Sequence, residues 1–260
     1  MVAVVGAGRV AGPATASAVQ AVGGFDLEFS LPGTGRRREP LPACAGERFE
    51  DAVPVRPFRF GKGLASFAGW WWMASTGRHV GFESWLERDH LMLLDFDPDV
   101  IAVSSQPFWL RWQGEDGRDR RHAPDFFIRL ADGAGVVVDI RPDDRIPEKD
   151  AEVFAVTAAA CSAAGWEFRR RGEVDPVLVA NVRWLSRYRH PRCAGAGDIA
   201  DVLLEVFAGG GGLFAGAERA GDRLRVLPAL FHLMWRGHLV AGLSEGPLGP
   251  ATLVRTGERR

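Results

Sequence analysis

Hydrophobic and polar positions along the chain alternate in ways that predict a mixed α/β fold. Residues 83–94 predict a helix with Glu83 and Glu87 on one face, while Trp85 lies elsewhere and can pack into a core. A second helix is predicted from Pro147 to a glycine stop at Gly165. The run VIAVSSQPFWLRW predicts two strands that are separated at Gln106-Pro107. WEFRRR predicts a further strand, and Asp175-Pro176 predicts the start of another helix. Helices that alternate with strands indicate a mixed layer architecture.

The stretch RHAPDFFIRLADGAGVVVDIRP predicts a β-hairpin with strands at 126–130 and 136–141. In the second strand, Val137, Asp139 and Arg141 share one face, because side chains alternate along a strand. Folding at the turn brings Asp125 opposite residues 139–141, where opposed residues lie about 5 Å apart at Cβ. A register error of one residue would instead place the two aspartates on opposite faces.

The C-terminal part predicts a small separate domain at 195–260, after a linker-like PRCAGAG segment. DIADVLLEVFA and VLPALFHLMWRG predict helices, GGGG predicts a break, and HLVAGL and ATLVRT predict two strands around SEGPLGP. Helix, helix, strand, wing and strand form a winged-helix-like pattern. The alternative is a packing segment that binds a partner protein, because the predicted helices carry few basic residues.

The N-terminal part predicts little regular structure. Residues 1–45 are rich in alanine and glycine and predict a loosely ordered segment. Its GAGRVA stretch is superficially like a dinucleotide-binding fingerprint. Gly12-Pro13 would interrupt the required helix, and no βαβ series follows, so we reject this interpretation. Further on, the WWW run predicts core packing or an interdomain contact, in preference to base stacking.

Composition narrows the class of protein. The chain has 260 residues, 47% hydrophobic and 25% charged, with a net charge of −1, which is ordinary for a globular protein of one or two domains. No apolar run is long enough to span a bilayer, and the start lacks the basic region of a signal peptide. We therefore expect a cytoplasmic protein without a membrane partner. The 3 cysteines fit neither a disulfide framework nor a zinc site.

Three carboxylates suggest metal chemistry. Asp125 and Asp139 from the hairpin, joined by Glu87 from the first helix, would form an oxygen-rich site for Mg²⁺ or Mn²⁺, with Arg141 beside them. Phosphodiester hydrolysis uses such a site. The alternative is structural, since aspartates are common at strand ends and Asp139 with Arg141 could be an exposed charge pair. Asp139 interrupts a run that otherwise predicts a core strand, and a charge there needs a reason.

These residues carry a resemblance to a known family. PDF followed after a turn by VVVDIRP resembles the PD-(D/E)XK nuclease signature. More narrowly, FESWLERDHLMLLDFDPDV, SSQPF, HAPDFF and VVVDIRP together resemble the N-terminal domain of TnsA-type transposon endonucleases. The likeness covers about residues 78–192. The C-terminal tail resembles the winged-helix half of the same proteins.

The resemblance implies a restriction-endonuclease-like mixed sheet flanked by helices over residues 46–192. It also implies Mg²⁺-dependent cleavage of double-stranded DNA at transposon ends, with a DDE transposase and an AAA+ ATPase regulator as partners. The family's helix glutamate falls on Glu87, with Glu83 as a nearby second candidate. Its two strand positions fall on Asp125 and Asp139. Its lysine falls on Arg141, which is a departure.

The departure keeps alternative functions open. Arginine cannot exchange its proton as a buried lysine can, so Arg141 would orient water or stabilise charge without acting as a base. A second possibility is a restriction or repair nuclease of the same fold that acts without a transposase. A third possibility is a non-catalytic DNA-binding or assembly subunit with a degenerate nuclease site.

Overall fold

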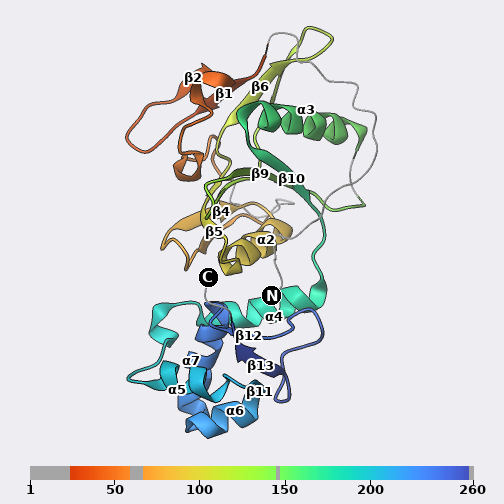
Figure 1. Ribbon diagram of the computed structural model, residues 1–260. Coiled ribbons are helices and arrows are strands. Elements are labelled where there is room, and N and C mark those ends of the chain that lie inside the picture. The colour runs from red at the N-terminus through yellow and green to blue at the C-terminus, as the bar shows by residue number, and fades with distance from the viewer. Residues whose placement is uncertain (1–23, 59–66, 145–146, 258–260) are drawn as a thin grey trace. The chain divides into compact units, whose positions relative to one another are not determined.

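The chain forms two compact units in a computed structural model that describes residues 24–58, 67–144 and 147–257 (Figure 1). The larger unit takes in the described residues up to Leu91 together with Asp99–Glu173. The smaller unit takes in Met92–Pro98 and the residues from Val174 onwards. The fold is mixed α/β, as predicted. Within the described ranges, no helix is both long and apolar enough to cross a membrane.

A mixed four-stranded sheet forms one half of the larger unit, in the order β10-β9-β8-β5. Strands β9 and β10 are parallel, and the other pairs are antiparallel. Helix α3 packs along β10 (Figure 1), which agrees with a restriction-endonuclease-like sheet flanked by helices. The elements are α2 (Trp85–Phe96), β5 (Val100–Ser105), β8 (Phe126–Leu130), β9 (Gly135–Ile140), α3 (Glu148–Ala164) and β10 (Glu167–Arg171).

A second four-stranded sheet is antiparallel throughout, in the order β2-β1-β6-β7. Alternation along β1 buries Leu27 and Phe29 completely, while Asp26 and Glu28 face outward. A separate hairpin joins β3 to β4. The elements are β1 (Asp26–Phe29), β2 (Arg37–Pro40), α1 (Leu41–Cys44), η1 (Phe49–Asp51), β3 (Gly69–Trp72), β4 (His79–Phe82), β6 (Trp109–Gln113) and β7 (Asp119–His122).

Aromatic packing joins the two sheets of the larger unit. The ring of Phe49 lies 5.0 Å from that of Phe29 in one sheet and 5.8 Å from that of Phe127 in the other, measured between centroids. Trp166, just before β10, lies 5.3 Å from Phe49 and meets it edge to face. Edge-to-face pairs contribute about 0.5–1.5 kcal/mol beyond the burial of their area. This core therefore fixes how the two sheets face each other.

The chain passes between these sheets twice at one place. The first passage leaves β5 through Gln106, which has a positive φ of 47°. The second passage leaves β7 through Ala123 and Pro124 and enters β8 after Asp125. The two passages are hydrogen-bonded to each other, because the Gln106 N–H donates to the Asp125 carbonyl at 2.9 Å. A non-glycine residue in the left-handed region is uncommon and costs energy, so the surrounding contacts must hold it there.

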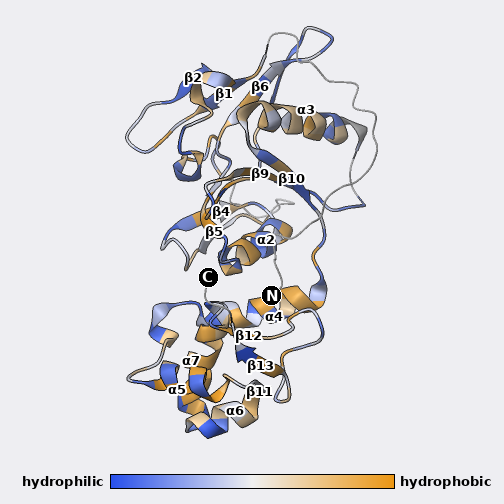
Figure 2. Cartoon of the chain, viewed as in Figure 1, coloured by the Kyte–Doolittle hydropathy of each residue, from blue (hydrophilic) through white to orange (hydrophobic). Residues whose placement is uncertain are grey.

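The smaller unit consists of helices and a three-stranded sheet in the order β11-β13-β12. Asp175 caps the first helix as predicted, because its carboxylate accepts the Leu178 N–H at 2.7 Å. Figure 2 shows hydrophobic residues concentrated along α4 and α7. The elements are α4 (Pro176–Leu185), η2 (Ser186–Tyr188), η3 (Pro191–Cys193), α5 (Ile199–Val206), β11 (Gly211–Gly212), α6 (Leu213–Ala220), α7 (Arg223–Trp235), β12 (Leu239–Val240) and β13 (Leu253–Thr256).

Several predictions of local structure are confirmed and others are wrong. The hairpin, α3, α4 and the break at Gln106 are confirmed, and α2 is confirmed two residues later than predicted. Loose order is wrong for residues 26–44, because β1 pairs with β2 there, and β1 and α1 supply buried core residues. The rejected dinucleotide fingerprint lies outside the described residues. Helix α6 was not predicted, because its sequence LFAGAERA is short and rich in alanine and glycine.

The tryptophans also correct the prediction of a buried aromatic run. Trp70 lies on β3, a strand of an isolated two-stranded hairpin, and is 52% exposed. Trp85 was expected to pack into the core but is 51% exposed at the start of α2. It stacks on Phe67, and the Arg88 guanidinium lies 4.3 Å from the centre of its ring. The side chains of Phe67, Trp85 and Arg88 therefore pack against one another at the surface and not in the core.

Candidate active site

The hairpin places the two predicted aspartates opposite each other. Phe126 of β8 pairs with Val138 of β9, so the preceding Asp125 lies across from Asp139. The Asp125 N–H donates to Asp139 Oδ1 at 3.3 Å, and the Ile140 N–H donates to Asp125 Oδ2 at 2.7 Å. The predicted register is therefore confirmed, and the two carboxylates occupy the open end of the hairpin.

Asp139 is buried in a strand that is covered on both faces. All of the residues of β9 are buried, and Asp139 itself is 2% exposed. A charge in such a strand is costly unless it has hydrogen-bonding partners. His122 at the end of β7 supplies one, because its Nε2 lies 2.9 Å from Oδ2 and 3.0 Å from Oδ1 of Asp139. The two residues come from different sheets.

Glu87 lies in the first turn of α2, where it also serves as a cap. Its backbone N–H donates to Ser84 Oγ at 3.1 Å. The Ser84 hydroxyl donates to Glu87 Oε1 at 2.8 Å, and the Glu83 N–H donates to Glu87 Oε2 at 2.7 Å. This arrangement is close to a capping box. Burial raises the pKa of Glu87, and the opposing contributions of its hydrogen bonds and of Arg141 do not cancel that effect.

Glu83, the second candidate for the helix glutamate, has a different partner. Its two carboxylate oxygens accept from Arg56 at 2.8 and 2.6 Å, in a bidentate ion pair. Glu87 has no such ion pair among the described residues. Of the two glutamates, Glu87 is therefore the one whose carboxylate has no arginine partner among the described residues.

Asp125 carries the strongest electrostatic signature of the site. Its burial raises its pKa well above the ordinary value, and the negative charges of Asp139 and Glu87 raise it further. The Ile140 N–H and the charge of Arg141 act in the opposite direction. The Asp125 Oδ1 accepts no hydrogen bond from any described residue. Two negative side chains thus act on Asp125, one of whose oxygens accepts no hydrogen bond from a described residue.

Arg141 stands beside these carboxylates without a tight partner among them. Its Nε lies 3.5 Å from Asp150 Oδ2, its Nη1 donates to the Ile140 carbonyl at 3.1 Å, and 42% of its side chain is exposed. Its charge lowers the pKa values of both Asp125 and Glu87. The four predicted residues therefore form one electrostatic group, although no ion pair joins Arg141 to the site carboxylates among the described residues.

Comparison with known families gives an independent view of this region. Residues 97–173 match the family model described as TnsA-like endonuclease N terminal. The resemblance drawn from the sequence is confirmed over these residues. The matched part of the TnsA-like domain contains Asp125, Asp139 and Arg141, whereas Glu87 precedes it. No curated protein matches the chain.

The carboxylates of the candidate site are groups of the kind that bind a divalent cation. Carboxylate oxygens are the ligands that Mg²⁺ prefers, and Mg²⁺ commonly uses one or two of them together with water and substrate phosphate. Asp125 offers a free oxygen and a charge that burial disfavours. Among the described residues, no group of three or more histidine, cysteine, aspartate or glutamate side chains is gathered closely enough to hold an ion by itself. The donor set therefore fits a cation shared with solvent or substrate.

His122 is the residue of this site that the sequence did not reveal. It stands in the HAPDFF stretch, three positions before Asp125, but no role followed from that spacing. Its contact with Asp139 depends on how the second sheet faces the first. The useful signal was Asp139 itself, because a carboxylate inside VVVDI requires a polar partner somewhere in the fold.

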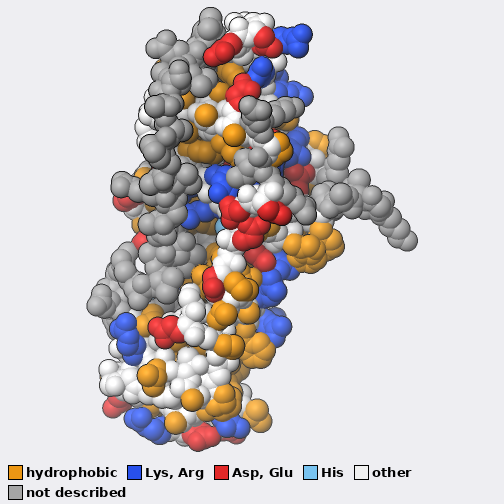
Figure 3. Space-filling view, turned by 90° about the vertical axis from the view of Figure 1, so that its right-hand side faces the viewer, with side chains coloured by type: hydrophobic (Ala, Val, Ile, Leu, Met, Phe, Trp, Pro, Cys, Tyr) orange, Lys and Arg blue, Asp and Glu red, His pale blue; other side chains and the backbone are white. Residues whose placement is uncertain are grey.

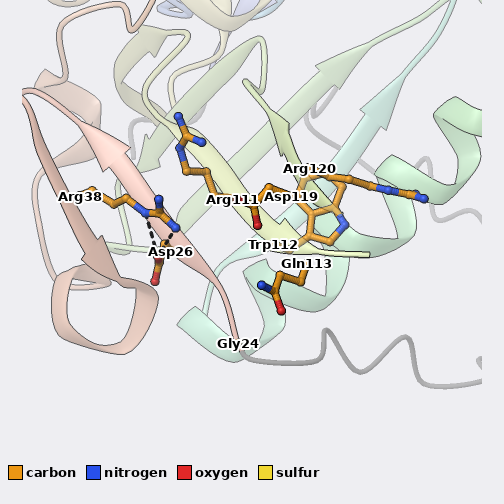
Figure 4. A pocket seen from close by; sticks show the side chains of 8 residues that line it. All are labelled: Gly24, Asp26, Arg38, Arg111, Trp112, Gln113, Asp119 and Arg120. Atoms are coloured by element: carbon orange, nitrogen blue, oxygen red, sulfur yellow. Dashed lines mark hydrogen bonds and ion pairs between the residues drawn. The ribbon is translucent and has the colours of Figure 1, made fainter. Parts of the chain in front are cut away.

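A separate pocket of the larger unit lies on the second sheet, away from these carboxylates. It encloses about 280 Å³ and is lined by Gly24, Asp26, Arg38, Arg111, Trp112, Gln113, Asp119 and Arg120 (Figure 4). Its arginines are already paired with carboxylates. Arg38 bonds to Asp26 within the pocket, while Arg111 bonds to Glu28 and Arg120 to Glu152. The pocket is therefore not the candidate nuclease site.

The raised pKa of Asp125 predicts a stability that depends on pH. The folded state binds this proton more tightly than the unfolded chain, in which aspartates titrate near ~3.9. The corresponding stabilisation is full below that value and is lost as pH rises through the folded pKa. We expect Asp125→Asn to be more stable than the wild type at pH ~7 with chelator present, because the amide buries no charge. The advantage should shrink towards pH ~4. Urea unfolding at both pH values measures it.

The matched control is Asp132→Asn at the exposed turn of the same hairpin, whose Oδ1 accepts only the Ala134 N–H. This variant should show no gain at neutral pH. Equal stability changes for the two variants at both pH values would contradict the electrostatic account of Asp125.

Proposed function

We propose that this protein is a metal-dependent DNA endonuclease subunit of a heteromeric transposase, which hydrolyses phosphodiester bonds at transposon ends. The observation that carries the proposal is the opposed pair of Asp125 and Asp139, inside the region that matches the TnsA-like endonuclease model. The resemblance to transposon endonucleases implies double-stranded DNA as the substrate, with a DDE transposase and an AAA+ ATPase as partners.

The residues divide the work of hydrolysis as follows. Asp125, Asp139 and Glu87 would hold Mg²⁺ or Mn²⁺, and Asp125 contributes most because it has a free oxygen and lies beside the negative charges of Asp139 and Glu87. When bound, such an ion polarises the phosphoryl oxygen and activates water. Arg141 supplies a fixed positive charge for the developing negative charge on phosphorus-bound oxygens. It does not take the proton from water, because a guanidinium keeps its own.

Contacts with DNA phosphates would come from local groups of arginines, which lie at residues 36–38, 118–121, 169–171 and 183–192. On the face shown in Figure 3, lysine and arginine side chains are interspersed with aspartate and glutamate and form no single continuous basic patch. A net charge of −1 agrees with this distribution. We therefore propose that this protein depends on its partners, more than on its own charge, to concentrate it at the transposon end.

We propose that residues 195–260 form a winged-helix-like domain that contacts the partner proteins. The order α5, β11, α6, α7, β12, β13 supports the proposal, because residues 241–252 would form the wing. Most of α7 is buried, and its exposed part is the first turn, where Leu224 is 85% exposed between Arg223 and Arg225. An exposed leucine flanked by arginines suits a protein surface better than a base edge.

A degenerate nuclease is the second candidate, and one observation favours it. Arg141 occupies the position where the family has lysine. Its guanidinium forms an ion pair with Asp150 and donates to the Ile140 carbonyl. In that case the protein would bind DNA or assemble the transposase without cutting.

Nicking of end DNA tests the proposal directly. Purified protein with Mg²⁺ or Mn²⁺, alone and with its transposase, should nick a duplex that carries the transposon end. Asp125→Ala should lower the rate on the order of 10²–10³-fold or more, as expected when a group that stabilises transition-state charge is removed. Asp132→Ala, at the other end of the same hairpin, is the matched control and should nick like the wild type. Equal rates for the Asp125 variant and the wild type would rule out this site.

Substitutions of Arg141 separate the active nuclease from the degenerate one. If the guanidinium acts through its charge, Arg141→Lys should keep nicking within about tenfold, and Arg141→Met should lose about 10²-fold. Arg118→Met, in an exposed turn with 85% of its side chain accessible, is the control. A wild type that cannot nick, together with a lysine variant that can, would establish the degenerate alternative.

The surface around Leu224 is tested by binding. We expect Leu224→Glu to weaken association with the transposase or ATPase partner by at least about tenfold, because the complex would bury a charge in place of an apolar side chain. Leu253→Glu, at a leucine that is 75% exposed on β13, is the control. Titration calorimetry of the full-length proteins measures both. Unchanged partner binding, combined with a salt-dependent loss of DNA binding in Arg225→Glu, would show instead that this turn reads DNA.

A further inference from the structure

His122 holds Asp139 by a contact that the proposed mechanism has not used. The imidazole Nε2 lies 2.9 and 3.0 Å from the two carboxylate oxygens, and the side chains of His122 and Asp139 are 16% and 3% exposed. The other hydrogen bond that a described residue makes to this carboxylate comes from the Asp125 N–H at 3.3 Å. His122 is therefore the closest partner of a buried charge.

The chain around His122 explains how this contact is kept in place. Residues 122–125 (HAPD) connect β7 of one sheet to β8 of the other, and Ala123 and Pro124 between them are buried. Proline fixes its own φ and restricts the residue before it, so this connection has few conformations. One short segment thus approaches Asp139 twice, through the imidazole at its first residue and the backbone N–H at its last.

Asp139 would have nothing comparable without the imidazole. It lies on the same face of β9 as Val137, which belongs to the apolar core, and its charge helps to raise the pKa of the neighbouring Cys161 thiol. A carboxylate left unpaired in such surroundings would turn towards solvent or take up a proton. Either change would remove it from its position opposite Asp125.

We propose that His122 is a positioning residue of the nuclease site, which holds the Asp139 carboxylate opposite Asp125 so that both can serve one divalent cation. The inference rests on the proposed function and deepens it. Residues that hydrogen-bond to the ligands of a metal typically contribute about 10–100-fold to metal affinity or activity. His122 does not touch the reacting phosphate, and its role is exerted through Asp139.

Binding of Mn²⁺ to the purified full-length protein, followed by electron paramagnetic resonance, tests the inference without relying on cleavage. His122→Ala should weaken Mn²⁺ binding by about 10–100-fold. His122→Gln should restore most of it, because the glutamine amide can donate an N–H from a similar distance. His79→Ala, at an exposed histidine on β4, is the matched control and should bind like the wild type. Thermal unfolding of each variant verifies that it is folded.

The outcomes separate this inference from the proposed function. If Asp125→Ala loses Mn²⁺ and His122→Ala does not, the site stands and the role of His122 is overturned. If the wild type binds no more Mn²⁺ than Asp125→Ala, the metal site and the role of His122 both fall. Should the alanine variant fail to fold, the glutamine variant decides. Near-normal affinity supports the role, and affinity as low as that of Asp125→Ala overturns it.

Discussion

The burial of one carboxylate inside a strand covered on both faces constrains the whole larger unit. The buried Asp139 carboxylate is hydrogen-bonded by a histidine from another sheet and by the backbone N–H of the residue before the neighbouring strand. Both donors lie at the ends of the connection from β7 to β8. The aromatic core around Phe49 fixes the two sheets against each other, so packing distant from the carboxylate sets the geometry around it.

The candidate site holds buried carboxylates close together, which is unfavourable for the stability of the folded state. Burial raises the pKa values of Asp125 and Glu87, and the negative charges of Asp139 and Glu87 raise that of Asp125 further. Arg141 offsets part of these increases without forming a tight pair with any of the three carboxylates. Perturbed pKa values of this kind cluster at functional sites. The match to the TnsA-like endonuclease model covers the strands that build this arrangement.

Local pattern was enough to predict part of this structure, and the reason is physical. The opposition of Asp125 and Asp139 follows from a strand period of two residues and a short turn, both readable in the sequence. The start of α4 followed from Asp175-Pro176 in the same way. The contact of His122 could not be read, because it depends on how two sheets pack. The prediction that Trp85 packs into the core was wrong, because hydrophobicity alone does not say which face of a helix meets the core. The capping role of Glu87 was also not predicted, because it depends on the side chain of Ser84 and the backbone of Glu83.

The double passage at Gln106 and Asp125 gives the fold a specific mechanical property. Two of the connections between the sheets run through one hydrogen-bonded junction, and Asp125 and Asp139 lie directly beside it. The hydrogen bond at this junction ties the two sheets together, in addition to the aromatic packing around Phe49. The two aspartates therefore lie where the backbone itself joins the sheets, which limits how far they can move apart.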